Sequence, residues 1–221
     1  GNTGWVDSDI TGLSPHLWLD SNYASSFFTD SGKGTPVTAD GDRFGCWADR
    51  SGNSFDWLQT TTNSQPNLVK QLGSNNLTAA LFGADNIAFT GTAGSEIDSK
   101  DMTFVWAVRL GFRDSEWLWV ETNSNTRMRL IGTGADLQFQ VVPFGAGGSY
   151  SGGSGTVTTS TNAKFAREVN LITIRTNSSA NTTKVYLNGG AAIGSSTAPS
   201  AAGKFLEDGH VIDMINNAYE A

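Results

Sequence analysis

The sequence predicts an all-β protein built as an antiparallel two-sheet β-sandwich. Charged residues make up only 16% of its 221 residues and 26 residues are glycine, a composition poor in helix-forming side chains. Short apolar-polar alternations recur along the chain, and clusters of Gly, Asn and Ser separate them. A chain of this length buries roughly 70% of its unfolded surface, so it needs no disulfide or metal to hold a core. The same length predicts one domain over residues 1–221.

Period-two alternation predicts the central strands. In the run 104–110, Phe104 and Trp106 alternate with Val105 and Ala107, which predicts a strand with one strongly apolar face. The runs 127–130 and 137–141 alternate in the same way. We expect these two runs to form neighbouring antiparallel strands.

The C-terminal half predicts further strands and one hairpin. The runs 169–175 and 183–187 are rich in β-branched and aromatic residues. The second run ends at Asn188-Gly189, a dipeptide that accepts positive φ and so predicts a tight hairpin turn. The last twelve residues could form either a helix or a strand. Apolar residues recur there at helical spacing, but residues 210–215 could equally be a closing strand.

The Gly-rich stretch 145–155, GAGGSYSGGSG, predicts a long loop at the rim of the sandwich. Its Tyr150 is a candidate contact residue, since loops on rigid scaffolds often carry binding groups. The alternative is a tether whose tyrosine packs locally.

Charge and composition exclude several partners. A net charge of -7 argues against duplex nucleic acid and against anionic membranes. No apolar run is long enough to insert into a bilayer. One cysteine, Cys46, and two distant histidines, His16 and His210, offer no metal-ligand spacing. We therefore expect no cofactor, and we expect Cys46 to be a buried, inert thiol.

An ordered set of short motifs occupies residues 15–90. They are PHLWLD at 15–20, CWADRSGN at 46–53, DWLQ at 56–59, Gln65-Pro66, and ALFG at 80–83. This order resembles the concanavalin A-like lectin/glucanase superfamily in its laminin G-like form, found in secreted bacterial proteins and in phage tail and virion proteins. The resemblance implies a jelly-roll sandwich, an extracellular or virion-surface location, and a role in binding, adhesion or virion assembly.

The motif residues themselves favour a structural role. Trp18 and Trp47 are expected to bury their rings in the core, with Asp20 at the end of the first motif. The polar residues of the second motif are expected to bond nearby backbone amides and to fix a turn around Gly52; they are Asp49, Ser51 and Asn53. Oxygen atoms of Asp49, Asn53 or Asp56 could also hold calcium, although their spacing resembles no recognised calcium loop.

Catalysis is not expected. The superfamily's glucanases use an E-x-D-x-x-E strand, and Glu96-Ile97-Asp98 matches only its first half. The third carboxylate is the shorter Asp101, and the segment is expected in a loop, whereas retaining hydrolysis needs carboxyl groups about 5 to 5.5 Å apart. No nucleophile elbow accompanies a histidine, and we expect His16 to be a turn residue.

Binding or assembly remains. Sugars stack on exposed aromatic rings, and the candidates are Trp57, Trp117, Trp119 and Tyr150. Trp117 and Trp119 are expected on one side of a short strand, where core burial is the competing explanation. We expect a non-catalytic, surface-displayed module that recognises a glycan or protein partner. The alternative is a structural virion protein, a decoration or fibre component that contacts homo-oligomeric or virion neighbours, and the third is a glycoside hydrolase.

Overall fold

The computed structural model describes part of the chain in detail. The described ranges are 10–72, 77–82, 89–92, 97–98, 103–108, 115–121, 127–133, 136–142, 155–159, 169–177, 179–180, 182–197, 204–206 and 211–214. Regular structure in these ranges is almost entirely β-strand in antiparallel pairs, which confirms the all-β prediction. None of the described segments forms a helix long and apolar enough to cross a membrane. The chain divides into two compact units, Gly1–Ser95 and Glu96–Ala221.

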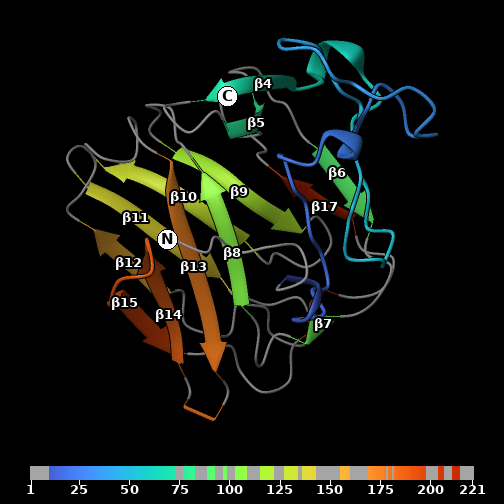
Figure 1. Cartoon of the computed structure of the whole chain (residues 1–221). Helices are drawn as coiled ribbons and strands as arrows, with labels where there is room; N and C mark the ends of the chain where they lie inside the picture. The colour runs from blue at the N-terminus through green and yellow to red at the C-terminus, as the bar shows by residue number, and fades with distance from the viewer. Residues whose placement is uncertain are drawn as a thin grey trace, which may run out of the picture. The chain divides into compact units, whose positions relative to one another are not determined.

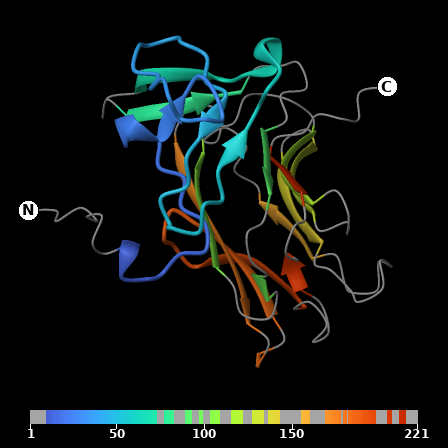
Figure 2. The ribbon, with the colours of Figure 1, turned by 90° about the vertical axis from the view of Figure 1, so that its right-hand side faces the viewer.

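The first unit contains short antiparallel strands. In order across its main sheet they are β1 (Phe27–Phe28), β2 (Cys46–Trp47), β3 (Trp57–Leu58) and β6 (Phe89–Thr92). A separate ribbon pairs β4 (Asn67–Leu72) with β5 (Leu77–Leu81), and Figure 2 shows these two strands side by side. Two short 3-10 turns, η1 (Ala24–Ser26) and η2 (Thr62–Ser64), precede β1 and β4.

Aromatic rings fill the core of the first unit. The Phe27 ring lies 4.7 Å from that of Phe44 in an edge-on contact and 5.2 Å from that of Trp47. Trp18 and Trp57 are buried, while Trp47 is half-buried. The expected core role of Trp18 is therefore confirmed. Edge-on ring pairs add about 0.5–1.5 kcal/mol each beyond area burial.

One sheet of the second unit contains the two strands expected to be neighbours. Its order is β17 (Val211–Met214), β9 (Ser115–Glu121), β10 (Arg127–Thr133), β11 (Asp136–Val142) and β12 (Gly155–Thr159). β10 and β11 pair antiparallel, with Leu130 opposite Phe139, as the alternation predicted. β17 decides the C-terminal alternative in favour of a strand, and the helical alternative is wrong over these four residues.

A short strand replaces part of an expected loop. Ile97–Asp98 forms β7, which pairs with β16 (Lys204–Leu206). The loop prediction is therefore wrong at these two residues. Backbone pairing with a segment about one hundred positions later in the chain decides the strand, and no local pattern carries that information.

A four-stranded sheet of the second unit, shown in Figure 1, contains the strands predicted over the runs 104–110, 169–175 and 183–187. Its order is β15 (Ala192–Thr197), β14 (Thr182–Leu187), β13 (Asn170–Asn177) and β8 (Thr103–Val108). Burial alternates along β13, with Asn170, Ile172 and Ile174 buried and the residues between them exposed or half-buried. Period-two side chains on a pleated strand produce this pattern.

The predicted Asn-Gly hairpin is confirmed. Asn188 and Gly189 have φ values of 52° and 70°, and the Gly190 amide donates to the Leu187 carbonyl at 3.0 Å. Positive φ at both central residues suits the twist of the flanking strands. The Asn188 side chain also accepts a hydrogen bond from the Leu171 amide at 2.8 Å, which anchors the turn to β13.

Candidate functional site

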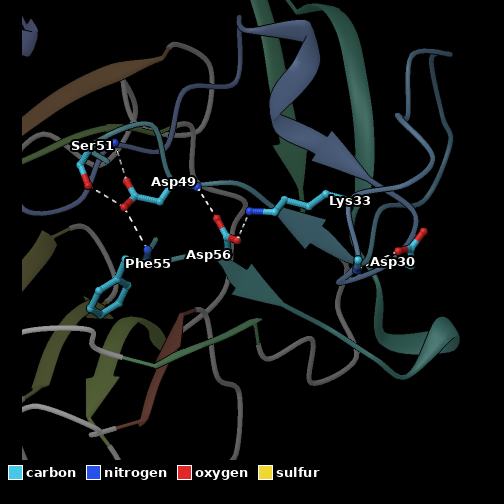
Figure 3. Close-up of polar contacts among 7 residues, drawn as sticks. Asp30, Lys33, Asp49, Ser51, Phe55 and Asp56 are labelled. Atoms are coloured by element: carbon cyan, nitrogen blue, oxygen red, sulfur yellow. Dashed lines mark hydrogen bonds and ion pairs between the residues drawn. The ribbon is translucent and has the colours of Figure 1, made fainter. Parts of the chain in front are cut away.

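The CWADRSGN motif forms a turn organised by one carboxylate (Figure 3). Asp49 Oδ1 accepts hydrogen bonds from the backbone amides of Trp18 and Ser51, both at 2.9 Å. Asp49 Oδ2 accepts from Ser51 Oγ at 2.5 Å and from the Phe55 amide at 3.0 Å. The carboxylate thus joins three separate positions of the backbone. The predicted turn-fixing role of Asp49 is confirmed.

The next motif residues connect this turn to His16. Ser51 Oγ accepts from the Asn53 amide and lies 3.1 Å from the His16 carbonyl oxygen. Asn53 Nδ2 donates to the same carbonyl at 2.9 Å. Asn53 was expected to bond backbone amides, and this expectation is wrong for its side-chain nitrogen, which meets a carbonyl. Gly52 between them has a φ of 91°, where a side chain would be strained.

Asp56 extends the same network on its other side (Figure 3). Asp56 Oδ1 accepts from the Asp49 amide at 2.9 Å, and Oδ2 pairs with Lys33 Nζ at 2.6 Å. The hydrogen bond to Asp56 raises the pKa of Lys33 above its ordinary value. Hydrogen-bond donors therefore surround both carboxylates. Calcium would have to displace these donors, so the site does not fit that ion.

No cluster of three or more His, Cys, Asp or Glu side chains able to hold a metal occurs in the described ranges. The carboxylates of the motif region serve the chain's own backbone and cations instead.

Arg50 joins the first motif to the second. Its guanidinium lies 4.1 Å from the Trp18 ring centroid and 3.8 Å from that of Tyr23, and it pairs with Asp20 at 2.5 Å. Cation-π contacts of this kind are worth about 0.5–2 kcal/mol. Sequence reasoning placed Asp20 in the motif but did not single out Arg50 or Tyr23. The only sequence signal was an arginine adjacent to a motif aspartate.

Cys46 is fully buried in β2 and is a free thiol. Burial raises its pKa to about 12, with the nearby Asp56 carboxylate adding to the shift. A protonated, buried thiol is neither a nucleophile nor a metal ligand at neutral pH. The expectation of a buried thiol is confirmed.

The aromatic residues proposed for ligand stacking are not brought together in the described ranges. Trp57 is 0% exposed in β3, opposite Trp47, so its expected role as an exposed stacking ring is wrong. Its ring instead belongs to the aromatic core, where it lies 6.3 Å from the ring of Phe55. Tyr150 and the other residues at 145–154 lie outside the described ranges.

Trp117 and Trp119 lie in β9, as a strand was expected there. The register with β10 shifts, so that Trp119 is opposite Met128 while Trp117 is opposite Arg129. Between these two pairs, β9 contains one extra residue, Leu118, that has no partner in β10. The regular pairing of β9 with β10 is therefore interrupted between Met128 and Arg129. Of the possible acidic triad, Asp98 lies in β7, and Glu96 and Asp101 lie outside the described ranges.

An exposed surface that the sequence analysis did not single out lies on β8, β13 and β14. We call it the outer face. It consists of three rows of paired residues on the side opposite the buried Ile172 and Ile174. The rows are Ala107 with Leu171, then Val105 with Thr173 and Tyr186, then Thr103 with Arg175 and Lys184.

Aliphatic side chains of the outer face are open to solvent. Val105 is 55% exposed and Leu171 is 41% exposed, and Val169 beside them is also exposed. The other side of the same strands carries Ile172, Ile174 and Val185, which are buried almost completely. The sequence carried one sign of an apolar outer face, because Val105 and Ala107, which alternate with Phe104 and Trp106, are apolar as well.

A scan of protein-family models found no family that matches this chain, and a search of curated proteins found no matching relative. Function is therefore argued from the surface and its chemistry.

Proposed function

We propose that this chain is a non-catalytic binding or adhesion module, displayed outside the cell or on a virion, that holds a protein or glycan partner on its outer face. The observation that carries the proposal is the exposure of Val105 and Leu171 on a sheet whose reverse side is buried. Exposed aliphatic residues gathered on a regular sheet mark interaction surfaces more often than isolated ones do. A sheet also holds its side chains in fixed relative positions.

The laminin G-like jelly roll is part of this proposal. The motif order in residues 15–90 supports it, and so do the two larger antiparallel sheets of the second unit, whose strands β12 and β15 lie close together. In such a sandwich one sheet face belongs to the core and the other is free for a partner.

The engagement of the motif carboxylates supports a non-catalytic role. Asp49 and Asp56 accept hydrogen bonds from backbone amides, and Asp20 pairs with Arg50. A glycosidase needs two carboxyl groups facing a sugar, one of them free to transfer a proton. These three carboxylates serve the chain's own turns.

A variant with charges on the outer face tests the proposal. Val105→Asp combined with Leu171→Asp places two carboxylates where a partner would bury aliphatic groups, and it leaves the core untouched because both positions are exposed. Leu13→Asp is the matched control, since Leu13 is 71% exposed in the other unit. Binding is measured on a glycan array, on cells and on virus particles.

We expect the outer-face variant to lose binding and the control to keep it. Binding by both variants would overturn the proposal. A signal on the glycan array or on cells supports the binding module. A silent array together with assembly on particles supports the alternative, a structural virion component whose outer face is covered by neighbouring subunits. Glycan hydrolysis that disappears in Glu96→Gln would replace both with a glycosidase.

A further inference from the structure

The outer face carries two cations directly opposite each other. Arg175 of β13 pairs in register with Lys184 of β14, and both side chains are exposed. Like charges at directly opposite positions of an antiparallel pair repel each other. In the described ranges, ion pairs involve Lys33 and Arg50, and no carboxylate pairs with either Arg175 or Lys184. The repulsion is therefore not relieved within the described part of the chain.

This cation pair contrasts with the rest of the chain. The sequence holds 14 Lys and Arg against 21 Asp and Glu. In the part of the outer face that the structure describes, the rows hold these two cations and no carboxylate, on a protein that is negative overall. Such a local field attracts an anionic group and repels other copies of the same positive face.

The chemistry of the outer face changes along the strands. Its cationic row lies at Arg175 and its aliphatic row at Leu171, four residues earlier in β13. Four residues of strand span about 14 Å. Val105 and Thr173 lie in the row between the two ends. A matching ligand needs carboxylates at one end and an aliphatic group about 14 Å away.

We infer that the outer face binds an extended acidic segment of a partner protein, with its carboxylates on Arg175 and Lys184 and an aliphatic side chain on Leu171 and Val105. The inference rests on the proposed function. An extended peptide has the same rise per residue as the strand beneath it, so an acidic residue and an aliphatic residue about four positions apart fit both ends.

A protein segment fits this face better than a sulfated glycan does. A glycan would use stacking rings and hydrogen-bonding groups along its length. Here the aliphatic end offers side chains without polar atoms, and the one aromatic residue in the rows, Tyr186, is half-buried. A second copy of the outer face would bring its cation pair either against this one or against the aliphatic row, and in neither arrangement would a carboxylate of the rows meet the cations.

The test is an NMR titration of the labelled full chain with three probes. The first is a short synthetic peptide with two adjacent glutamates and a leucine about four positions away. The second has glutamine in place of both glutamates, and the third is a heparin-type sulfated oligosaccharide. We expect amide shifts at residues 103–107, 171–175 and 184–186 with the acidic peptide alone, weakening in about 0.5 M salt.

Variants assign the two ends. Arg175→Gln combined with Lys184→Gln should weaken binding of the acidic peptide by about tenfold or more, as should Leu171→Ser. Lys70→Gln is the matched control, because it removes an exposed cation from β4 and should leave binding unchanged.

Three results would overturn the inference. Equal binding of the glutamine peptide would remove the role of charge. Binding of the oligosaccharide with no effect of Leu171→Ser would assign the face to a glycan. Absence of shifts with every probe would also refute it. If the Asp variants at Val105 and Leu171 still abolish binding in the cell or particle assays, the proposed function stands and only the acidic segment is wrong.

Discussion

Replacement of Asp49 by asparagine tests whether one carboxylate holds the motif turn together. In Asp49→Asn, the remaining oxygen can still accept from the Trp18 and Ser51 amides, which both bond Oδ1 in the native chain. The new NH2 group then faces the Phe55 amide, which loses its acceptor at 3.0 Å. The opposite amide orientation is worse, because it deprives two backbone amides instead of one.

The cost follows from burial. Phe55 is 2% exposed, so its amide cannot easily find water, and an unsatisfied buried donor costs about 1–3 kcal/mol. Asp49→Ala removes the acceptor for three backbone amides at once, and we expect about 3–5 kcal/mol because neighbouring losses do not add fully. That is a large share of the roughly 5–15 kcal/mol that stabilises a typical domain.

Urea unfolding followed by tryptophan fluorescence measures these differences, since the chain contains 7 Trp. Amide hydrogen exchange at residues 18, 51 and 55 reports the local loss. Asp42→Asn is the control, because Asp42 bonds through its backbone in the described ranges, and we expect a change within about 0.5 kcal/mol. Equal stability of Asp49→Asn and this control would refute the role given to the carboxylate.

Three other changes have defined outcomes. Gly45→Ala places a Cβ 2.5 Å from the Thr29 carbonyl oxygen, so urea unfolding should show a loss of about 1–3 kcal/mol, whereas Gly34→Ala has open space and should be neutral. Cys46 should react slowly with Ellman's reagent until urea unfolds the chain. Because its folded pKa of about 12 exceeds the ordinary 9.0, the stability it contributes is full below pH 9 and falls as pH rises toward 12. If the stability of Cys46→Ala falls as steeply between pH 9 and 12, ionisation of the Cys46 thiol is not the cause. Lys184→Gln should raise stability by about 0.2–1 kcal/mol in urea, and a decrease would show that no repulsion exists.

Local chemistry made some features predictable from sequence. The hairpin at Asn188-Gly189 follows from two adjacent residues that accept positive φ, and the structure shows both. The strand β13 follows from the β-branched residues of the run 169–175, although apolar and polar residues do not alternate with burial there, since Asn170 is buried and Leu171 is exposed. The turn-fixing role of Asp49 follows from short-range bonding to residues 51 and 55. In each case the deciding interaction lies within a few positions or within one strand.

Other features depend on residues far apart in the sequence. Trp57 resembled a candidate ligand contact, but its ring is buried in a core that segments from separate parts of the chain build. Arg50 meets the Trp18 and Tyr23 rings about thirty positions earlier. The shift in register near Trp117 arises from pairing with β10. No pattern within one segment specifies which distant segment lies beside it.

The two sides of β13 separate stability from the binding that we propose for the outer face. Ile172 and Ile174 are buried and contribute to the core, so truncation to alanine at either site should cost about 2–5 kcal/mol. Leu171 and Arg175, which flank this pair on either side, are exposed, so their replacement removes less buried surface. Like charges at opposite positions, here Arg175 and Lys184, are expected to disfavour the folded sheet. Substitutions at residues that do not stabilise the fold can change binding without unfolding the chain. On this sheet, such residues lie on the outer face.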